Sequence, residues 1–363
     1  MKTGLLYKET LLGRKNIGDY IQSLAASQFF ETIDYHIQQE YIDKFTTGGE
    51  CVKVIMNGWF MSNPNNWPPS ADILPLFVSF HITPGAYNKM LSHEGVEYLK
   101  KHEPIGCRDM DTMETLLKNG ISAYYSSCLT LTLGLKYKEN EKSGEIIFVD
   151  PYYEFHRNTN KRISLIPISK SIVTLLFNYR LVMKIAKRFF FKSLFVKRNK
   201  ILYKIESILR AACFYRVYKT KFTDELLTQA TYITHIQEPS PVDMSAERFE
   251  IANELVKRYA KASLVVTSRI HAALPCLGIE TPVIFTTLDN PYKGKNIHSV
   301  GRFKGLSDLF RILVFEKNRL TTDDELLVKI NKIGLDSCIV NKDNYNLYKK
   351  MLIEKCSAFA KRQ

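Results

Sequence analysis

A permanent cation and a titratable side chain stand together in ASLVVTSRIHAALPCLGIETPVIF, which covers residues 262–285. Residues 264–267 are apolar and mostly β-branched, so they predict a buried strand, and Ser268 is of a type that caps helices. Arg269 and His271 then fall in the first turn of the expected helix. Such a helix start attracts anions through its free backbone N–H groups and its positive dipole end. The alternative is an ordinary strand–helix–strand unit with Arg269 in solvent.

Further cations are expected at similar positions. Arg108 follows the predicted strand 104–107, and its planar guanidinium suits a carboxylate or a phosphate. A surface ion pair of Arg108 with Asp109 or Asp111 is the alternative. Four more basic residues follow the predicted strand 283–286 and would lie at the same sheet edge as Arg269; they are Lys293, Lys295, His298 and Arg302. Several cations on one rim predict a site for a small polyanion, although each alone would also suit a solvated loop.

Polar and glycine residues stand in the first expected strand-to-helix loop. Asn16, Gly18 and Asp19 follow the predicted strand 3–7 and enter a helix that we expect over residues 19–31. Glycine lets backbone approach a ligand, and the Asp19 carboxylate would bind a sugar hydroxyl or accept its proton. The spacing is not GxGxxG, so a dinucleotide site is not predicted. The alternative is that Asp19 caps the helix and the glycines form a turn.

The elements around these residues alternate between strands and helices. Strands are predicted at 3–7, 51–56, 76–81, 104–107, 121–124, 145–149, 231–235, 264–267 and 283–286. This alternation predicts an α/β protein with two doubly wound, Rossmann-like domains that face each other across a cleft. We place the first domain at 1–135, a polar linker at 136–144 and the second domain at 145–340. A helix within 341–363 would pack back on the first domain.

The net charge of +14 is concentrated in a helical insertion that we expect at 161–221. From Arg180 to Lys221, thirteen basic residues stand against one acidic residue, a net of +12. Those from 180 to 192 recur at spacings of three and four, next to a run of phenylalanines. A basic amphipathic helix with aromatic residues is typical of binding to an anionic membrane surface, here through residues 180–204. The alternative is a packed helical hairpin with a solvated basic face; no nucleic-acid-binding motif accompanies the charge, so nucleic acid is not an expected partner.

Cysteine usage and polarity exclude several protein classes. The seven cysteines include no CxxC pair and the histidines lack metal-ligand spacing, so neither a metal centre nor a disulfide framework is expected. The first residues lack the sustained apolar stretch of a signal peptide, and no run approaches the roughly 18 apolar residues of a membrane-spanning helix. The expected location is the cytoplasm, with peripheral attachment to the inner face of the cell membrane.

Three segments resemble the polysaccharide pyruvyl transferase family: NIGDYIQSLAA near the start, IGCRDMDTMETLLKNGI in the middle and LVVTSRIHAALPCLGIETPVIF near the end. They occur in the family's order and cover both halves of the chain. The resemblance implies a fold like the two-domain glycosyltransferase-B arrangement. It also implies transfer of pyruvate from phosphoenolpyruvate to a sugar as a cyclic ketal, with release of phosphate and no metal or organic cofactor. In place of the glycine-run turn common after an early strand of the family, this chain has Asn57-Gly58-Trp59.

The resemblance also implies roles for the candidate residues. Arg269 and Arg108 would hold the donor's carboxylate and phosphate, and His271 would be the general acid or a phosphate-activating donor. The other donor-binding candidates are Ser268, Lys293, Lys295, His298 and Arg302. On the acceptor side, Asp19 would be a base or an anchor for a hydroxyl. The other acceptor-binding candidates are Asn16, Gly18 and Asn57.

Together these features predict a membrane-associated pyruvyltransferase that acts on a lipid-linked sugar of a capsule or exopolysaccharide precursor. Two other functions stay open. One is a nucleotide-sugar-dependent glycosyltransferase of the same architecture, which would not release phosphate from phosphoenolpyruvate. The other is a non-enzymatic membrane-surface binding protein, in which His271→Ala and Arg269→Ala would leave function intact.

Overall fold

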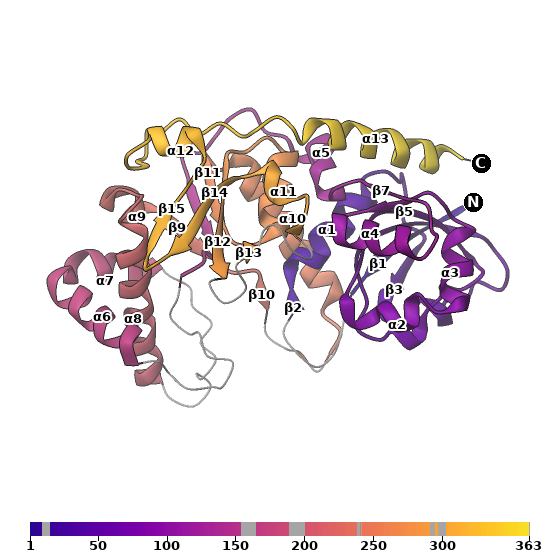
Figure 1. The fold of residues 1–363 in the computed structure, drawn as a ribbon, viewed down its shortest axis with the longest axis horizontal. Helices are drawn as coiled ribbons and strands as arrows, with labels where there is room; N and C mark the ends of the chain where they lie inside the picture. The colour runs from indigo at the N-terminus through magenta and orange to yellow at the C-terminus, as the bar shows by residue number, and fades with distance from the viewer. Residues whose placement is uncertain are drawn as a thin grey trace.

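Two mostly parallel sheets form the framework of the protein (Figure 1). The structure is a computed structural model, and it describes residues 1–8, 15–153, 165–188, 200–237, 240, 242–290, 295–296 and 303–362. Three predicted donor-binding residues, Lys293, His298 and Arg302, lie outside the described residues. In the described part of the chain, no helix is long and apolar enough to cross a membrane.

The first sheet belongs to the N-terminal half. Its strands are β1 Lys2–Tyr7, β3 Tyr35–Gln38, β4 Val52–Phe60, β5 Ile73–Ile82, β6 Ile105–Cys107 and β7 Ala123–Tyr125. The helices of this half are α1 Ile17–Ser27, α2 Tyr87–Met90, α3 His93–Lys100, α4 Met110–Lys118 and α5 Gly134–Tyr137. The strand order is β3-β1-β4-β5-β6-β7 and every neighbouring pair is parallel. The chain therefore reverses its winding direction between β1 and β4.

Both faces of this sheet are buried. Leu5 of β1 and Ile55 of β4 pack into the core around α1, whereas Leu6 and Val54 pack into the core that includes α3 and α4. Successive strand residues point to opposite faces, so burial of both faces requires continuous apolar runs. That requirement is why the sequence predicts these strands.

The second sheet has the same design. Its strands are β8 Ile146–Val149, β9 Thr231–Ile233, β11 Leu264–Thr267, β12 Val283–Asn290, β14 Arg311–Glu316 and β15 Arg319–Thr321. The remaining helices of the C-terminal half are α9 Asp224–Gln229, α10 Ser245–Lys261, α11 Ile270–Gly278, α12 Glu325–Lys329 and α13 Asn346–Lys361. The order is β15-β14-β12-β11-β8-β9, parallel except for the antiparallel pair β14–β15, and β13 Lys295–Asn296 pairs antiparallel with the end of β12. Here the winding reverses between β8 and β11.

Between β8 and α9 the described chain includes the helices α6 Leu165–Phe177, α7 Tyr179–Arg188 and α8 Lys200–Tyr218. They form a lobe, here called the insertion lobe, at the end of the molecule farthest from the first sheet (Figure 1). Aromatic rings fasten it to the second sheet, since the Phe148 ring of β8 lies 5.5 Å from that of Phe214 and 5.7 Å from that of Tyr218. The predicted helical insertion is therefore confirmed. Its phenylalanine run at 189–191 lies outside the described residues.

A short antiparallel ribbon links the two halves. β2 Lys15–Asn16 pairs with β10 Ile236–Gln237, and the backbone N–H of Ile17 donates to the carbonyl oxygen of His235 at 2.9 Å. Helix α13 returns to the first sheet, where the Lys53 ammonium donates to the carbonyl oxygen of Ala360 at 2.9 Å. The α/β class with two Rossmann-like sheets is confirmed. The glycosyltransferase-B designation and the domain boundaries stay predictions.

Candidate active site

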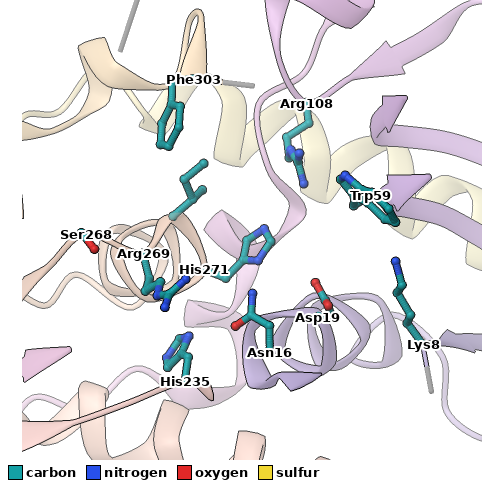
Figure 2. A pocket seen from close by; sticks show the side chains of 11 residues that line it. Lys8, Asn16, Asp19, Trp59, Arg108, His235, Ser268, Arg269, His271 and Phe303 are labelled. Carbon is teal, nitrogen blue, oxygen red and sulfur yellow. The ribbon is translucent and has the colours of Figure 1, made fainter. Parts of the chain in front are cut away.

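A pocket of about 250 Å³ lies where the two halves meet (Figure 2). Six of the predicted site residues line it: Asn16, Asp19, Arg108, Ser268, Arg269 and His271. Its other lining residues are Lys8, Trp59, His235, Ile270 and Phe303. The residues come from segments far apart in the sequence, so the fold is what assembles them.

The pocket lies at the points where the winding of both sheets reverses. Lys8 follows β1 and Trp59 lies in β4, the two strands at the reversal of the first sheet. Ser268 and Arg269 follow β11, and β8 beside it ends just before Asp150. Open α/β sheets bind ligands at such switch points, outside the carboxyl ends of the strands.

The Asp150 carboxylate orients Arg269. It accepts a hydrogen bond from Arg269 Nε at 2.9 Å and another from the backbone N–H of His235 at 3.0 Å. The Ser268 hydroxyl donates to the carbonyl oxygen of Asp150 at 2.6 Å. Asp150 has a φ of 41°, in the left-handed region that residues other than glycine seldom adopt. Strain of this kind persists where surrounding contacts enforce it, often at functional sites. Sequence reasoning missed Asp150, although an aspartate directly after a buried strand was a usable signal.

The start of α11 differs from the prediction. Arg269, not Ser268, occupies the position before the first helical residue, and its side chain makes no capping hydrogen bond. The prediction that Ser268 caps the helix is wrong because the Ser268 hydroxyl bonds to Asp150 instead. No cap side chain therefore stands between the positive end of the helix and an anion.

A glutamine in α1 connects three of the pocket residues. The Gln22 amide oxygen accepts a hydrogen bond from Arg108 Nη1 at 3.5 Å, which turns its amide nitrogen toward His271 Nδ1 at 3.5 Å and Asp19 Oδ1 at 3.4 Å. Because an amide nitrogen can only donate, Nδ1 of His271 is the acceptor and the ring proton lies on Nε2. Sequence reasoning missed Gln22. Its spacing of three from Asp19, which places both on one face of a helix, was the available signal.

Arg108 lies in the wall of the pocket and is only 2% exposed. Its Nε is 3.8 Å from Oδ2 of Asp109, which also contacts His81 Nδ1 at 2.6 Å. Burial works to raise the pKa of the Asp109 carboxyl, but the His81 hydrogen bond and the nearby charges of His81 and Arg108 outweigh it and lower that pKa. The alternative of a surface ion pair is wrong because both partners are buried. The carboxylate instead holds the arginine in the interior.

The predicted acceptor residues divide into two groups. Asn16 caps α1 through its side-chain oxygen, which accepts from the Gly18 N–H at 3.1 Å. Helix α1 therefore starts two residues before the predicted 19, and the alternative that Asp19 is the cap is wrong. Asp19 lines the pocket from the first turn. Asn57 does not line it; its side chain donates to the carbonyl oxygen of Gln22 at 3.0 Å and so positions α1.

The first sheet contributes a cation that sequence reasoning missed. Lys8 Nζ lies 3.4 Å from the centroid of the Trp59 ring and 3.2 Å from Glu40 Oε1. The Glu40 carboxylate is buried and accepts the backbone N–H of Ser62 at 3.0 Å. Lys8 directly follows a predicted strand, and Trp59 belongs to the Asn57-Gly58-Trp59 segment that departs from the family pattern, so both carried a weak signal.

His235 is a buried, neutral residue in the wall of the pocket. Sequence reasoning missed it as well. It is fully buried, and its Nε2 lies 2.7 Å from the Tyr259 hydroxyl. Burial lowers the pKa of His235 to about 4; the Asp150 carboxylate opposes this and the Arg269 cation adds to it. Its imidazole is therefore uncharged at neutral pH.

The arrangement suits a small anion next to a hydroxyl-bearing ligand. Lys8, Arg108 and Arg269 supply positive charge, and Asp19 supplies a carboxylate beside them. Among the described residues, no three His, Cys, Asp or Glu side chains are grouped to hold a metal ion. Of the predicted cationic loop, Lys295 is placed in β13 beside the end of β12.

Comparison with known proteins places the chain in a family. The sequence model of the family described as polysaccharide pyruvyl transferase matches residues 16–290, more than half of the 363 residues. The match includes every pocket-lining residue except Lys8 and Phe303. A comparison with curated proteins finds no match. The chain belongs to the polysaccharide pyruvyl transferase family.

Proposed function

We propose that this pyruvyl transferase takes pyruvate from phosphoenolpyruvate and attaches it to two hydroxyls of a sugar as a cyclic ketal. The observation that carries the proposal is the meeting of Arg108, Arg269 and His271 in one small pocket. Phosphoenolpyruvate has a carboxylate and a phosphate, and the planar fork of an arginine suits each of them. The uncapped start of α11 offers a further site for anionic oxygens.

The reaction joins the central carbon of the donor to both sugar oxygens and breaks its bond to the phosphate oxygen. The two hydroxyls lose one proton each. One proton ends on the methylene carbon, which becomes a methyl group, and the other leaves with the phosphate. Asp19 lines the pocket with a carboxylate and would accept a hydroxyl proton.

His271 has two candidate roles in this scheme. As an imidazolium it would protonate the methylene carbon, and as a neutral ring it would donate Nε2–H to the leaving phosphate. The contact with Gln22 favours the neutral Nε2–H form and therefore the second role. Arg108 and Arg269 would share the developing negative charge of the phosphate.

The size of the pocket supports this donor over a nucleotide sugar. Sites that enclose drug-sized ligands have volumes of roughly 300–1,000 Å³. A volume of about 250 Å³ is below that range and suits a three-carbon phosphate ester. A nucleotide-sugar-dependent glycosyltransferase would need space for a base, a ribose and a diphosphate as well.

The test is incubation with phosphoenolpyruvate and a panel of acceptors that contain galactose or mannosamine, both free and lipid-linked. We expect phosphate release and a mass gain of one pyruvyl group, with one solvent deuterium in the new methyl group when the reaction runs in D₂O. Arg269→Lys should lower kcat/KM for the donor by about a hundredfold, because an ammonium cannot replace the fork. The exposed Arg319→Lys is the matched control. Release of a nucleotide from a nucleotide sugar, with no phosphate from phosphoenolpyruvate on any acceptor, would overturn the proposal.

The proposal extends to a lipid-linked acceptor sugar. Its support is the concentration of positive charge in the insertion, which suits a protein working beside anionic lipid. The measurement is kcat/KM for one sugar presented on a lipid carrier and in free form. A higher value for the free sugar would contradict this extension while leaving the pyruvyl transfer itself intact.

A further inference from the structure

Helix α6 buries two hydroxyl side chains and exposes several large apolar ones. Ser171 is fully buried and Thr174 nearly so, and the Thr174 hydroxyl bonds within the helix to the carbonyl oxygen of Lys170 at 2.8 Å. A helix on the surface of a protein in water ordinarily buries apolar residues and exposes polar ones. Four large apolar side chains of α6 are exposed instead, whereas Leu175 packs against the core of the second sheet.

The outward side chains form one continuous apolar surface, here called the α6 face. Its members are Ile172, Val173, Leu176 and Phe177 of α6, with Tyr179 at the start of α7. Phe177 is 84% exposed and Leu176 is 74% exposed. Elsewhere in the described chain such side chains are exposed singly, as Leu347 is at 71%. Single exposed apolar residues need no explanation, whereas a contiguous group marks a contact surface.

The lobe that carries the α6 face also exposes basic side chains. Exposed cations of the three lobe helices are Lys170, Arg180, Lys184, Lys187 and Lys204. The acidic residue of this region, Glu206, is tied to Arg210 Nη2 at 2.6 Å. A lobe that exposes both an apolar surface and several cations complements an anionic bilayer, whose phosphates lie above its hydrocarbon.

The apolar side of α7 is already occupied. Val182 and Ile185 are fully buried in the core of the second sheet, so, apart from Tyr179 at its start, this helix exposes mainly its basic residues. The phenylalanines that the sequence sets beside this basic helix lie outside the described residues, so attachment through residues 180–204 stays a prediction. Among the described residues of the lobe, α6 provides the exposed apolar surface.

We propose that the α6 face inserts into the interface of an anionic membrane, with the exposed lysines and arginine of the lobe on lipid phosphates. The lobe helices project downward from the second sheet in Figure 1, the direction in which the arrow of β12 points. The lobe thus extends toward the side of the molecule that carries the carboxyl ends of the strands, where the pocket lies. Attachment through this face does not depend on the donor chemistry.

The test uses the full-length protein and flotation with vesicles of phosphatidylcholine, either alone or mixed with phosphatidylglycerol. We expect binding to the mixed vesicles only. Leu176→Ser combined with Phe177→Ser should weaken it by at least about tenfold, because the inserted apolar area is lost. Lys184→Glu combined with Lys187→Glu should weaken it by a similar factor and reduce its salt dependence. Leu347→Ser, an equally exposed position on α13, is the matched control and should bind like the wild type.

Insertion of the α6 face into the membrane can also be measured directly, in addition to the weakened binding of the variants. Phe177→Trp should gain fluorescence intensity, shift to the blue and be quenched by brominated lipid on mixed vesicles, whereas Leu347→Trp should not change. Unchanged flotation of the serine and glutamate variants would overturn the proposal. So would a serine variant that binds vesicles normally but loses a self-association seen by light scattering, since the face would then be a contact between copies. Pyruvyl transfer to a soluble acceptor should be equal in all these variants, so a failure of membrane binding is distinct from a failure of the proposed reaction.

Discussion

The backbone of Gly18 in α1 lies directly against the imidazole of His271 in α11. A Cβ at residue 18 would come within 2.7 Å of the His271 Cβ and 2.8 Å of its Nδ1. Real Cβ atoms essentially never make such contacts, so only glycine lets the two helices approach this closely. Gly18 therefore allows the N-terminal half to pack directly against His271, the candidate catalytic histidine of the other half.

Gly18→Ala should therefore displace His271 and disable the site. We expect kcat to fall by more than tenfold and the free energy of unfolding to fall by about 1–3 kcal/mol, the usual cost of overpacking. Kinetics with phosphoenolpyruvate and urea unfolding measure the two effects. Gly85→Ala is the control, because no atom lies within 4 Å of a Cβ there. Wild-type kcat in Gly18→Ala would show that the contact has no part in the reaction.

Asp150 should act on donor binding through Arg269. Asp150→Asn removes the charge that holds Arg269 Nε but keeps a residue that tolerates a left-handed backbone. We expect kcat/KM for phosphoenolpyruvate to fall by about tenfold, as for loss of one charge-assisted hydrogen bond, with little loss of stability.

Asp150→Ala separates backbone strain from charge. It should show the same kinetic loss and an additional decrease of about 1 kcal/mol in the free energy of unfolding, because alanine tolerates the left-handed region less well. If both variants kept the wild-type kcat/KM, the ion pair would be structural only.

The parallel strands could be predicted from sequence because each is buried on both faces. Leu264–Thr267 is an example, since its predicted and observed bounds agree. The helix starts could not be placed as well, because several capping residues competed. Asn16 and not Asp19 caps α1, and Ser268 bonds across to Asp150.

The cationic residues of the site were predictable, but the groups that orient them were not. An arginine after a strand suggests an anion site by its type alone, as at Arg108 and Arg269. Gln22 is an uncharged amide, and its importance depends on Arg108, 86 positions away in the sequence. His235 lies at the pocket because the β2–β10 ribbon and the hydrogen bond from the Ile17 N–H to its carbonyl oxygen hold this segment against the first half. Both depend on contacts that local spacing does not contain.

Stability should depend on pH through His235. Its pKa is about 4 in the folded protein against an ordinary value of 6.5. Between these two pH values His235 binds a proton in the unfolded chain but not in the folded protein, so the free energy of unfolding falls as the pH falls. Above pH 6.5 the neutral His235 causes no loss of stability. By about pH 4 its effect lowers the free energy of unfolding by about 3 kcal/mol.

His235→Gln should make the free energy of unfolding less dependent on pH between 6.5 and 4, measured by urea unfolding at several pH values. Its stability should be lower throughout, since the contact with Tyr259 changes, so the slope and not the level is the diagnostic quantity. The exposed His93→Gln controls for the loss of a histidine. A slope equal to that of the wild type would contradict a neutral, buried His235.

Gln22 should set the proton position on His271. Gln22→Met keeps the length of the side chain but removes both polar atoms, so Arg108 and His271 lose their shared partner. We expect kcat to fall by about tenfold while KM for the donor changes little, because the ring is misdirected and the arginines stay in place.

Gln22→Glu replaces the neutral amide with a negatively charged carboxylate at the same position. A carboxylate there would favour the protonated imidazole, so the limb of the pH–rate profile that reports His271 should move to higher pH. A merely structural role for Gln22 would lower kcat without moving this limb. Gln229→Met, at an exposed glutamine of α9, is the control. Two results together would contradict this prediction: Gln22→Glu lowers kcat without moving the pH–rate profile, and Gln22→Met keeps the wild-type kcat. The contacts of Gln22 would then not control the protonation of His271, and the substrate would position its proton.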